Sequence, residues 1–158
     1  MEKSKNYIFF IGVALVSLVS AWLLYINSNR PVVNESKKTG AVIIKDLIID
    51  VEVVDTPEKQ AQGLSGREKI PDKAGMLFYF SEYRVRDFWM KNMLFPLDII
   101  WIDGGKVVGI SKNVPIPDGE SLPTYSSPSP VSMVLEVNSG FADKNNLKVG
   151  DRVDFYFK

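Results

Sequence analysis

Neither cysteine nor histidine occurs in this 158-residue chain. Without cysteine the protein can form no disulfide, no thiolate metal site and no thiolate nucleophile. Without histidine it lacks the commonest general base and the commonest metal ligand, which excludes Ser-His-Asp, Cys-His and zinc-histidine chemistry. Any catalysis would therefore depend on Asp, Glu, Lys, Tyr, Ser or Thr, and we expect neither a metal nor a cofactor.

The chain also lacks an excess of either charge, with 19 Lys and Arg residues against 19 Asp and Glu residues. Residues 41–158 hold 14 basic and 17 acidic side chains, a net charge of −3, and contain no basic cluster. Proteins that bind nucleic acid normally present a basic patch to the phosphates. We therefore expect no nucleic-acid partner.

One long stretch has no charge at all. Residues 7–26 are uncharged and rich in Ile, Leu, Val, Phe and Ala. A helix of this length spans about 30 Å, the thickness of the hydrocarbon core of a bilayer. Tyr7, Trp22 and Tyr25 lie near its ends, where amphipathic rings favour the headgroup level. The stretch is therefore predicted to be a transmembrane helix that follows a short tail, residues 1–6.

The same stretch has some features of a cleaved secretory signal. Lys3 and Lys5 form a basic amino-terminal region, and residues 19–21 (Val-Ser-Ala) fit a small-residue cleavage site. The apolar run is longer than a usual signal core and continues past that site, which favours an uncleaved anchor. If the amino terminus stays in the cytoplasm, the following domain lies outside it, either anchored to the cell membrane by a single pass or secreted after cleavage.

Residues 27–40 are polar, contain Pro31 and Gly40 and show no apolar periodicity, so they are predicted to be a linker. From residue 41 onward apolar and polar residues begin to alternate, which is typical of half-buried β-strands. Residues 41–158 are therefore predicted to form one globular domain.

Short β-strands dominate the prediction for this domain. The predicted strands are 41–44, 47–53, 76–80, 97–102, 107–110, 132–137 and 153–157. One short helix is predicted over residues 57–64 with Thr56 as its N-cap, and a second from Ser139 to about Asn146. Such strands, joined by Gly and Pro turns, are typical of a mainly β sandwich or barrel with two short helices.

Residues 88–98 place a cation, an amide and a carboxylate among large apolar side chains. Burying polar groups is costly unless each has a partner or a task, so this stretch is predicted to be the centre of the domain. On a strand, Asp87, Trp89 and Lys91 would share one face, where an acid, an indole and a cation can form a stacked, salt-bridged patch. Asp98 would open the next strand.

Three further residues attract attention through their surroundings. Arg67 follows the first predicted helix and is either a solvated surface residue or the anchor of a buried carboxylate. Tyr125 lies in the proline-rich segment 112–130, which is predicted to be a semi-rigid flap or, alternatively, a loop that covers a sheet edge. Glu136 lies on the polar face of a predicted strand whose other face is apolar.

The chain resembles a known family, domain of unknown function 192, also catalogued as the uncharacterised family UPF0127. The resemblance covers about residues 47–158 and rests above all on Phe88-Trp89-Met90-Lys91-Asn92 followed by Pro96-Leu97-Asp98. Other matching segments are 51–53, 55–58, 62–64, 75–78, 134–137 and 149–151. The family pattern usually has Asn-Thr where this chain has Asn92-Met93, so a hydroxyl beside the candidate site is missing.

The resemblance implies a compact, mostly β fold of sandwich type. Members of the family often carry a signal peptide or one membrane span, which agrees with the apolar stretch at residues 7–26. The resemblance also makes residues 88–98 the family signature, with Arg67 and Glu136 as companions. It implies no established activity.

Three functions fit these observations. The first is a membrane-tethered binding module in which Trp89, Lys91 and Asn92 contact an envelope glycan, an anionic group or a protein partner. The second is a hydrolase of envelope polymers in which Asp98 and Glu136 act as an acid–base pair, which requires that the two carboxyl groups share one layer of the fold. The third is a structural polar network that fixes strand register. The network would contain Arg67, Lys91, Asp98 and Glu136. The candidate ligand-binding residues are Arg67, Trp89, Lys91, Asn92, Asp98, Tyr125 and Glu136.

Overall fold

The computed structural model describes residues 19–22, 24–25, 37–119 and 121–157. The chain divides into two compact units, Met1–Ser36 and Lys37–Lys158. In the first unit the described residues are helical and exposed to solvent. Among all described residues, no helix is long and apolar enough to cross a membrane. The transmembrane span predicted over residues 7–26 lies for the most part outside the described residues, so it stays a prediction.

The described part of the second unit is built from short strands and two short helices. In chain order these are β1 (Thr39–Ile44), β2 (Leu47–Val54), α2 (Pro57–Gln62), β3 (Ala74–Arg84), β4 (Asp87–Trp89), β5 (Leu97–Asp103), β6 (Lys106–Val114), β7 (Thr124–Ser126), β8 (Val131–Asn138), α3 (Phe141–Lys144) and β9 (Val153–Phe157). Seven strands form one sheet in the order β6-β5-β8-β3-β2-β1-β9, and β4 pairs with β7. Within the large sheet, β2 and β3 run parallel and the other neighbours antiparallel.

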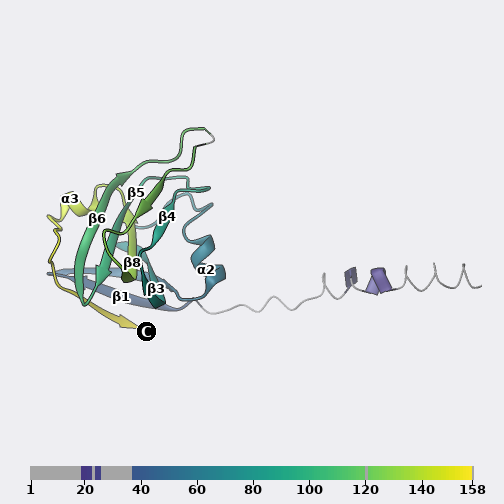
Figure 1. Cartoon of the computed structure of the whole chain (residues 1–158), viewed down its shortest axis with the longest axis horizontal. Coiled ribbons are helices and arrows are strands. Elements are labelled where there is room, and N and C mark those ends of the chain that lie inside the picture. Colours follow the sequence, from purple (N-terminus) through teal and green to yellow (C-terminus); the bar gives the residue numbers. More distant parts are fainter. Residues whose placement is uncertain (1–18, 23, 26–36, 120, 158) are drawn as a thin grey trace, which may run out of the picture. The chain divides into compact units, whose positions relative to one another are not determined.

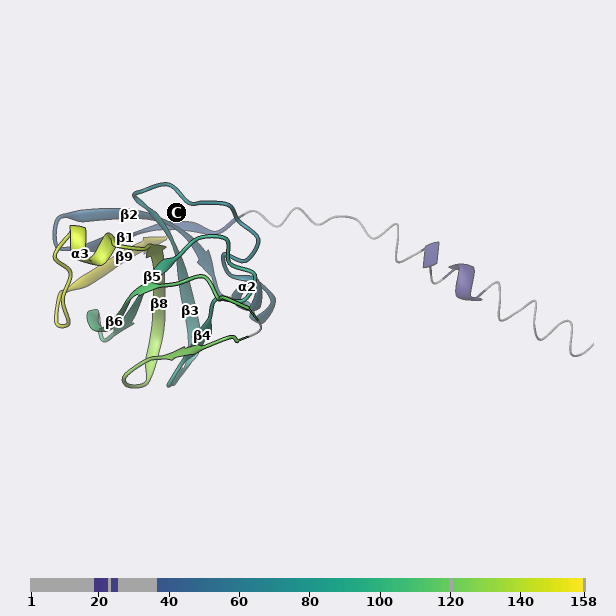
Figure 2. The same cartoon turned by 90° about the horizontal axis from the view of Figure 1, so that it is seen from above.

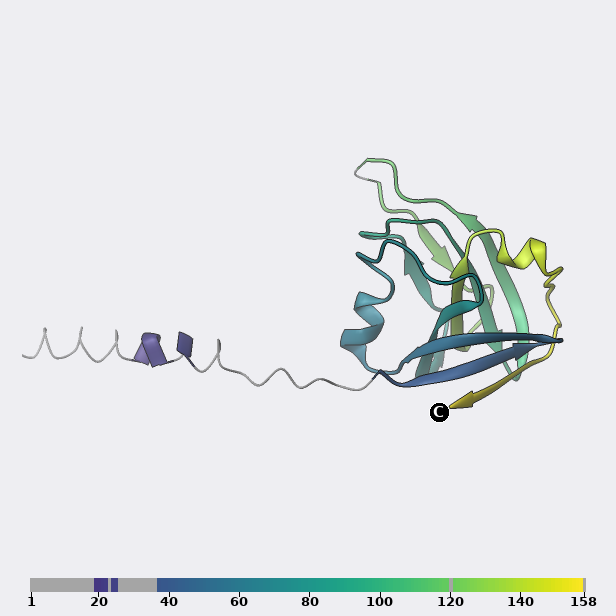
Figure 3. The same ribbon diagram turned by 180° about the vertical axis from the view of Figure 1, so that it is seen from behind.

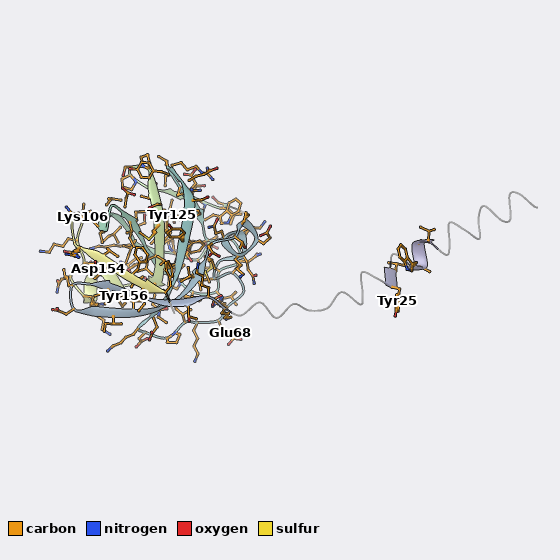
Figure 4. All side chains as sticks on the ribbon, turned by 90° about the horizontal axis from the view of Figure 1, so that it is seen from below. Tyr25, Glu68, Lys106, Tyr125, Asp154 and Tyr156 are labelled. Carbon is orange, nitrogen blue, oxygen red and sulfur yellow. The ribbon has the colours of Figure 1, made fainter. Side chains whose placement is uncertain are left out.

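The large sheet is curled, so that its two edge strands approach each other (Figure 1). Lys106, the first residue of β6, forms an antiparallel bridge with Arg152, just before β9. Beside the bridge, the N–H of Val107 donates to the carbonyl oxygen of Asp151 at 2.9 Å. Lys106, Asp154 and Tyr156 mark these two edges in Figure 4. The mainly β class predicted from the sequence is confirmed, and its form is a curled half-barrel.

Each face of the curled sheet buries its own apolar cluster. The cluster on the inner face draws on all seven strands and on α3, with Ile49, Leu77 and Leu135 among its members. The cluster on the outer face covers β3, β5 and β8 and includes Phe78 and Trp101. Because β5 packs on both sides, six of its seven residues are buried. A polar side chain on β5 or β8 therefore enters a core whichever face it points to.

The two helices lie on opposite sides of the domain in Figure 1, Figure 2 and Figure 3. α2 begins as predicted, because the Thr56 hydroxyl accepts from the N–H of Lys59 at 3.4 Å and Pro57 opens the first turn. The prediction for α3 was wrong in one respect: Gly140 occupies its N-cap position. The hydroxyl of Ser139, the predicted cap, instead donates to Asn113 Oδ1 at 2.7 Å.

The carboxylate of Asp98 takes over the capping of α3. Asp98 is completely buried on the inner face of β5. Its Oδ1 accepts from the N–H groups of Asn113 (2.7 Å) and Gly140 (3.2 Å), and its Oδ2 from that of Ala142 (2.8 Å). These are backbone donors that a helix start and a strand end leave without partners. Asp98 therefore joins β5, β6 and α3.

Three boundaries differ from the sequence-based predictions. β3 extends well beyond the predicted strand 76–80, to Arg84. The predicted loop 112–130 contains the end of β6 and the whole of β7. β1 begins at Thr39, inside the predicted linker. Arg84 pairs with β8 and β7 with β4, strands that are distant in the sequence, whereas the end of β6 continues its hairpin with β5.

Asp98→Asn is expected to lower the free energy of unfolding by about 3 kcal/mol, because the amide would turn a donor toward a backbone N–H and remove a charge-assisted acceptor. Urea denaturation measures the loss. The matched control is Asp143→Asn. The exposed Asp143 carboxylate pairs only with Lys112 among the described residues, at 2.5 Å, so its replacement should lower the free energy of unfolding by less than about 1 kcal/mol. Equal losses in the two variants would contradict the capping role.

Candidate ligand-binding site

The family signature folds into a short strand followed by a turn. β4 ends at Trp89, so Lys91 does not lie on the predicted strand face; β4 pairs with β7. Asn92 has a φ of 56°, a left-handed conformation that asparagine tolerates better than most residues. The turn is held by the segment after α2: the Ser65 hydroxyl donates to the Lys91 carbonyl and the Gly66 N–H to the Asn92 carbonyl, both at 2.9 Å.

The predicted contact between Trp89 and Lys91 is formed across this turn. Lys91 Nζ lies 5.9 Å from the centre of the Trp89 ring, near the outer limit of a cation–π contact. Trp89 is 57% exposed. Asp87 is not part of this pair, since its Oδ1 accepts from the Ser126 hydroxyl of β7 at 2.6 Å. The surface patch therefore consists of the Trp89 indole and the Lys91 ammonium group.

Next to Trp89 lies a cavity of about 270 Å³, between α2, the end of β3 and β4. Its apolar wall includes Phe78, Phe80 and Phe88, while Trp89 forms part of its mouth. Phe88 packs edge-on against Phe78, with ring centres 4.8 Å apart, and against Trp101, at 5.5 Å. The polar lining residues are Gln60, Gln62, Ser65, Arg84, Arg86, Asp87 and Glu136.

Glu136 lines this cavity from β8. It is only 5% exposed, and no donor among the described residues is within hydrogen-bonding distance of its Oε2. Desolvation by burial raises the pKa of Glu136 from 4.5 to about 8. At neutral pH this side chain is therefore predominantly the uncharged acid, which has an O–H to donate.

Gly75 keeps the neighbouring strand β3 close to Glu136. A Cβ atom at Gly75 would lie 2.6 Å from the carbonyl oxygen of Glu136, closer than a real contact allows. The absence of a side chain thus lets β3 pass directly beside the part of β8 that carries the buried acid. This geometry explains why a glycine belongs in the matching segment 75–78.

Arg86 is the second buried ionisable residue of the cavity, at 6% exposed. Its guanidinium lies 3.8 Å from the centre of the Phe80 ring, and its Nη2 donates to the Glu82 carbonyl oxygen. Its Nε has no partner among the described residues. Burial, together with the charge of Arg84, lowers the pKa of Arg86, yet a guanidinium remains a cation at neutral pH.

The proline-rich segment positions Arg86. The N–H of Arg86 donates to the Ser127 hydroxyl at 2.9 Å, and the N–H of Ser127 donates to the Arg86 carbonyl oxygen at 2.8 Å. No described residue of segment 112–130 lines the cavity. Through β7, which pairs with β4, the described part of the segment flanks the site, and the predicted flap over the Trp89 patch stays a prediction.

The predicted site residues fall into three groups. Trp89 and Glu136 line the cavity. Lys91 and Asn92 form the adjoining turn, and Tyr125 lies on β7 opposite Phe88, half-buried against the outer cluster. Arg67 and Asp98 lie elsewhere in the domain. The sequence therefore predicted part of the site and its rim.

Arg67 does anchor a carboxylate, that of Glu52 on β2. Their atoms pair twice, Nη1 with Oε2 at 2.9 Å and Nη2 with Oε1 at 3.0 Å, and Lys37 adds a contact at 3.2 Å. Burial raises the pKa of Glu52, but the hydrogen bonds and charges of Arg67 and Lys37 outweigh it, so the pKa is lowered. This ion pair ties the chain after α2 to β2.

The structural network predicted from the sequence is not formed. Among the described residues, no hydrogen bond or ion pair joins any two of its four members. Arg67 binds Glu52, Asp98 binds backbone N–H groups, and Lys91 is exposed. These four residues therefore lie at separate places in the domain and form no common network.

The predicted acid–base pair is contradicted by the strand register. Asp98 lies directly across from Val137 of β8, whereas Glu136 lies across from Ile99 of β5. Residues directly across a sheet share a face, and successive residues along a strand alternate between faces. Asp98 therefore points to the inner face and Glu136 to the outer face. Two carboxyl groups on opposite sides of a sheet cannot act on one bond.

Sequence reasoning missed Arg86 altogether. The available signal was the alternation of side chains along an extended chain. Arg86 precedes Phe88 by two residues and therefore shares its face. Its burial depends on the bond to Ser127, which no local pattern reveals. In the part of the chain that the structure describes, no group of three acidic residues could hold a metal ion. The cavity thus offers aromatic rings, one buried guanidinium and one buried carboxyl group, with Arg84 and Asp87 as further charged residues of the lining.

These features define a small, mainly β domain with a partly polar cavity beside its most distinctive segment. The sequence model of one family, DUF192, described as "Uncharacterized ACR", matches residues 40–155. The chain belongs to this family, and the resemblance predicted from its motifs is confirmed. No curated protein matches the chain.

Two crystal structures share the fold. A "putative transcription regulator" from Sinorhizobium meliloti 1021 is 32% identical with a TM-score of 0.66, and the match covers 76% of this chain and 94% of that one. A protein of unknown function from Novosphingobium aromaticivorans DSM 12444 is 29% identical with a TM-score of 0.67, covering 79% of this chain and 89% of that one. The fold is therefore shared with the proteins from these two organisms.

Glu136→Gln is expected to change how stability depends on pH. In the wild type, the unfolded Glu136 ionises near pH 4.5 while the native one keeps its proton up to about pH 8. The free energy of unfolding should therefore fall as the pH rises between these values, by up to about 5 kcal/mol, and level off above. The variant cannot ionise, so it should lose this slope and exceed the wild type in stability at about pH 9.

Urea denaturation from about pH 3 to about pH 9 measures both slopes, that of Glu52 below its unfolded pKa of 4.5 and that of Glu136 above it. Glu52→Gln provides a control of opposite sign, because the lowered pKa of Glu52 stabilises the native state above its unfolded pKa, and that contribution disappears as the pH falls through its native pKa. A Glu136→Gln variant that kept the wild-type slope would show that Glu136 is solvated and ionised in the native protein.

Proposed function

We propose that the chain is a membrane-tethered, extracytoplasmic module that binds a small ligand in the cavity beside Trp89. The tether is the uncharged segment 7–26, which has the length of a bilayer span. If the segment is cleaved instead, the same module is secreted. The proposed location and the proposed binding site rest on separate observations.

The observation that carries the binding site is the pair of buried, incompletely bonded side chains in one cavity. Glu136 Oε2 and Arg86 Nε both lack partners among the described residues, and both side chains line the cavity. Buried polar atoms in folded proteins nearly always bond to protein, water or ligand. Leaving such an atom unbonded costs about 1–3 kcal/mol. An occupant that bonds to both groups would remove this cost.

The remaining lining supports the same function. Ligand pockets are mostly apolar and aromatic, with a few polar groups that fix the orientation of the ligand. Phe78, Phe80 and Phe88 provide such a wall, and the exposed pair of Trp89 and Lys91 stands at the mouth. A purely structural domain would gain stability from filling this space with apolar side chains. The cavity therefore favours binding over a structural role.

Ala61→Trp is expected to block the cavity without unfolding the domain, because Ala61 is an exposed residue of α2 that lines it. We would purify the full-length protein from its native membranes in detergent and identify the small molecules that copurify by mass spectrometry. The wild type should carry at least one compound, and Ala61→Trp should lose most of it, since the indole occupies its place.

The matched control for this experiment is Lys144→Trp, which puts the same side chain on an exposed position of α3, on the other side of the domain. Lys144→Trp should retain the compound. An identical set of compounds in all three proteins, or none in the wild type, would contradict binding in the cavity.

The location is tested by a fusion. Alkaline phosphatase joined after Lys158 should be active in a bacterial host, because this enzyme folds only where disulfides form, outside the cytoplasm. Deleting residues 2–26 should abolish the activity and move the protein out of the membrane fraction. The intact mass of the full-length protein decides between anchor and secretion, since a cleaved form lacks the segment. An inactive full-length fusion would overturn the proposed orientation.

A further inference from the structure

We infer that the occupant of the cavity is a small aromatic carboxylate, whose ring packs against the phenylalanine wall and whose carboxylate binds the Arg86 guanidinium next to Glu136. This inference rests on the proposed binding function and names the class of ligand.

The number and kind of unpartnered atoms point to a carboxylate. Arg86 Nε–H is a donor, and the protonated Glu136 offers an O–H as a second donor. A carboxylate has only acceptor atoms, which suits two donor groups that line the same cavity. Two other polar groups of the lining are already engaged: Gln60 Nε2 donates to the Tyr79 carbonyl at 2.8 Å, and the Ser65 hydroxyl donates to the Lys91 carbonyl.

The apolar part of the lining points to a flat ring. Phe88 is edge-on to Phe80, with ring centres 6.5 Å apart, and to Phe78, at 4.8 Å. An aromatic ring gains from edge and offset contacts with such a wall in addition to the area it buries. The volume of about 270 Å³ lies at the small end of ligand pockets. A single ring with a short arm suits this volume better than an oligosaccharide.

The charges around the cavity favour an anion. The charged residues that line it are Arg84, Arg86 and Asp87, together with Glu136; the lining residues from α2 and the segment after it are uncharged. Asp87 already accepts from Ser126, and Glu136 is neutral at neutral pH because burial raises its pKa to about 8. The net charge that meets an occupant at neutral pH is therefore positive. Ionisation of Glu136 at higher pH would add a repelling charge.

Three probes of nearly equal size test the inference on the full-length protein in detergent: phenylacetate, phenylacetamide and 2-phenylethylamine. The indole N–H signal of Trp89 in NMR spectra, assigned with Trp89→Phe, reports whether a probe enters the cavity. At about pH 6.5, phenylacetate should bind at least tenfold more tightly than the amide or the amine, because only the carboxylate forms a charge-assisted hydrogen bond with the Arg86 guanidinium. Equal binding of carboxylate and amide, or tighter binding of the amine, would overturn the inference.

Two variants locate the carboxylate. Arg86→Met should weaken phenylacetate binding at least tenfold and leave the amide nearly unchanged, because it removes the charged donor. Arg152→Met is the matched control, since Arg152 is 81% exposed and pairs with Asp154 outside the cavity; it should bind like the wild type. If Arg86→Met does not fold, as circular dichroism would show, the comparison of the three probes on the wild type still decides.

A pH series adds an independent readout. The affinity of the wild type for phenylacetate should fall at least tenfold between about pH 6.5 and about pH 9, as Glu136 ionises, whereas Glu136→Gln should keep its affinity. A wild-type affinity that does not change over this range would contradict the position of the carboxylate beside Glu136.

The outcomes separate this inference from the function on which it rests. If the amide or the amine moves the Trp89 signal as strongly as phenylacetate, the cavity binds ligands but the ligand class is wrong. If no probe moves the signal, the ligand class is again wrong, and the copurification experiment with Ala61→Trp decides the binding function by itself.

Discussion

The pairing of β5 with β8 is the constraint on which the rest of the domain depends. Both are interior strands of the sheet, and both of their faces are covered, the inner by the curl and α3, the outer by β4, β7 and the segment after α2. Alternation along the strands then sends every side chain into one core or the other. An acidic residue placed on either strand must be stabilised by hydrogen bonds, lose its charge, or bind something.

Asp98 and Glu136 show two of these outcomes within one pair of strands. Asp98 on β5 meets three backbone N–H groups, which supply the hydrogen bonds that water would otherwise provide. Glu136 on β8 meets a cavity and apolar neighbours, and the charged form is disfavoured. The two acids have similar chemistry and are both buried, but the donors that face them differ. This difference separates a residue that stabilises the fold from one that suits a binding site.

Local patterns predicted the parts of the fold that depend on neighbouring residues. The strands around Asp98 and Glu136 and the N-cap at Thr56 follow from alternation and capping, and all are present. The alternation along β8 also predicted that Glu136 points to the face of the strand opposite its apolar face. These features involve contacts within a few residues, for which spacing along the chain is sufficient information.

The parts that were not predicted depend on contacts between distant segments. The chain pattern gives Arg67 a carboxylate partner but does not identify Glu52, because that choice depends on how the loop folds back on β2. Lys91 was placed on a strand because nothing local shows that Asn92 turns the chain into the left-handed region. Arg86 escaped notice because its burial requires Ser127, far along the sequence. The candidate site is assembled from such contacts. The sequence therefore predicted the signature segment of the site but not the buried Arg86.

The parallel pairing of β2 and β3 affects when the binding site forms during synthesis and folding of the chain. Parallel neighbours require a long crossover, and here the crossover carries α2 and one wall of the cavity. The opposite wall comes from β3 and β4, and the acid comes from β8, near the carboxyl terminus. No short fragment contains the site, and contacts of such long range form late in folding. A chain that emerges amino terminus first would become competent to bind only after nearly all of it had been released and folded.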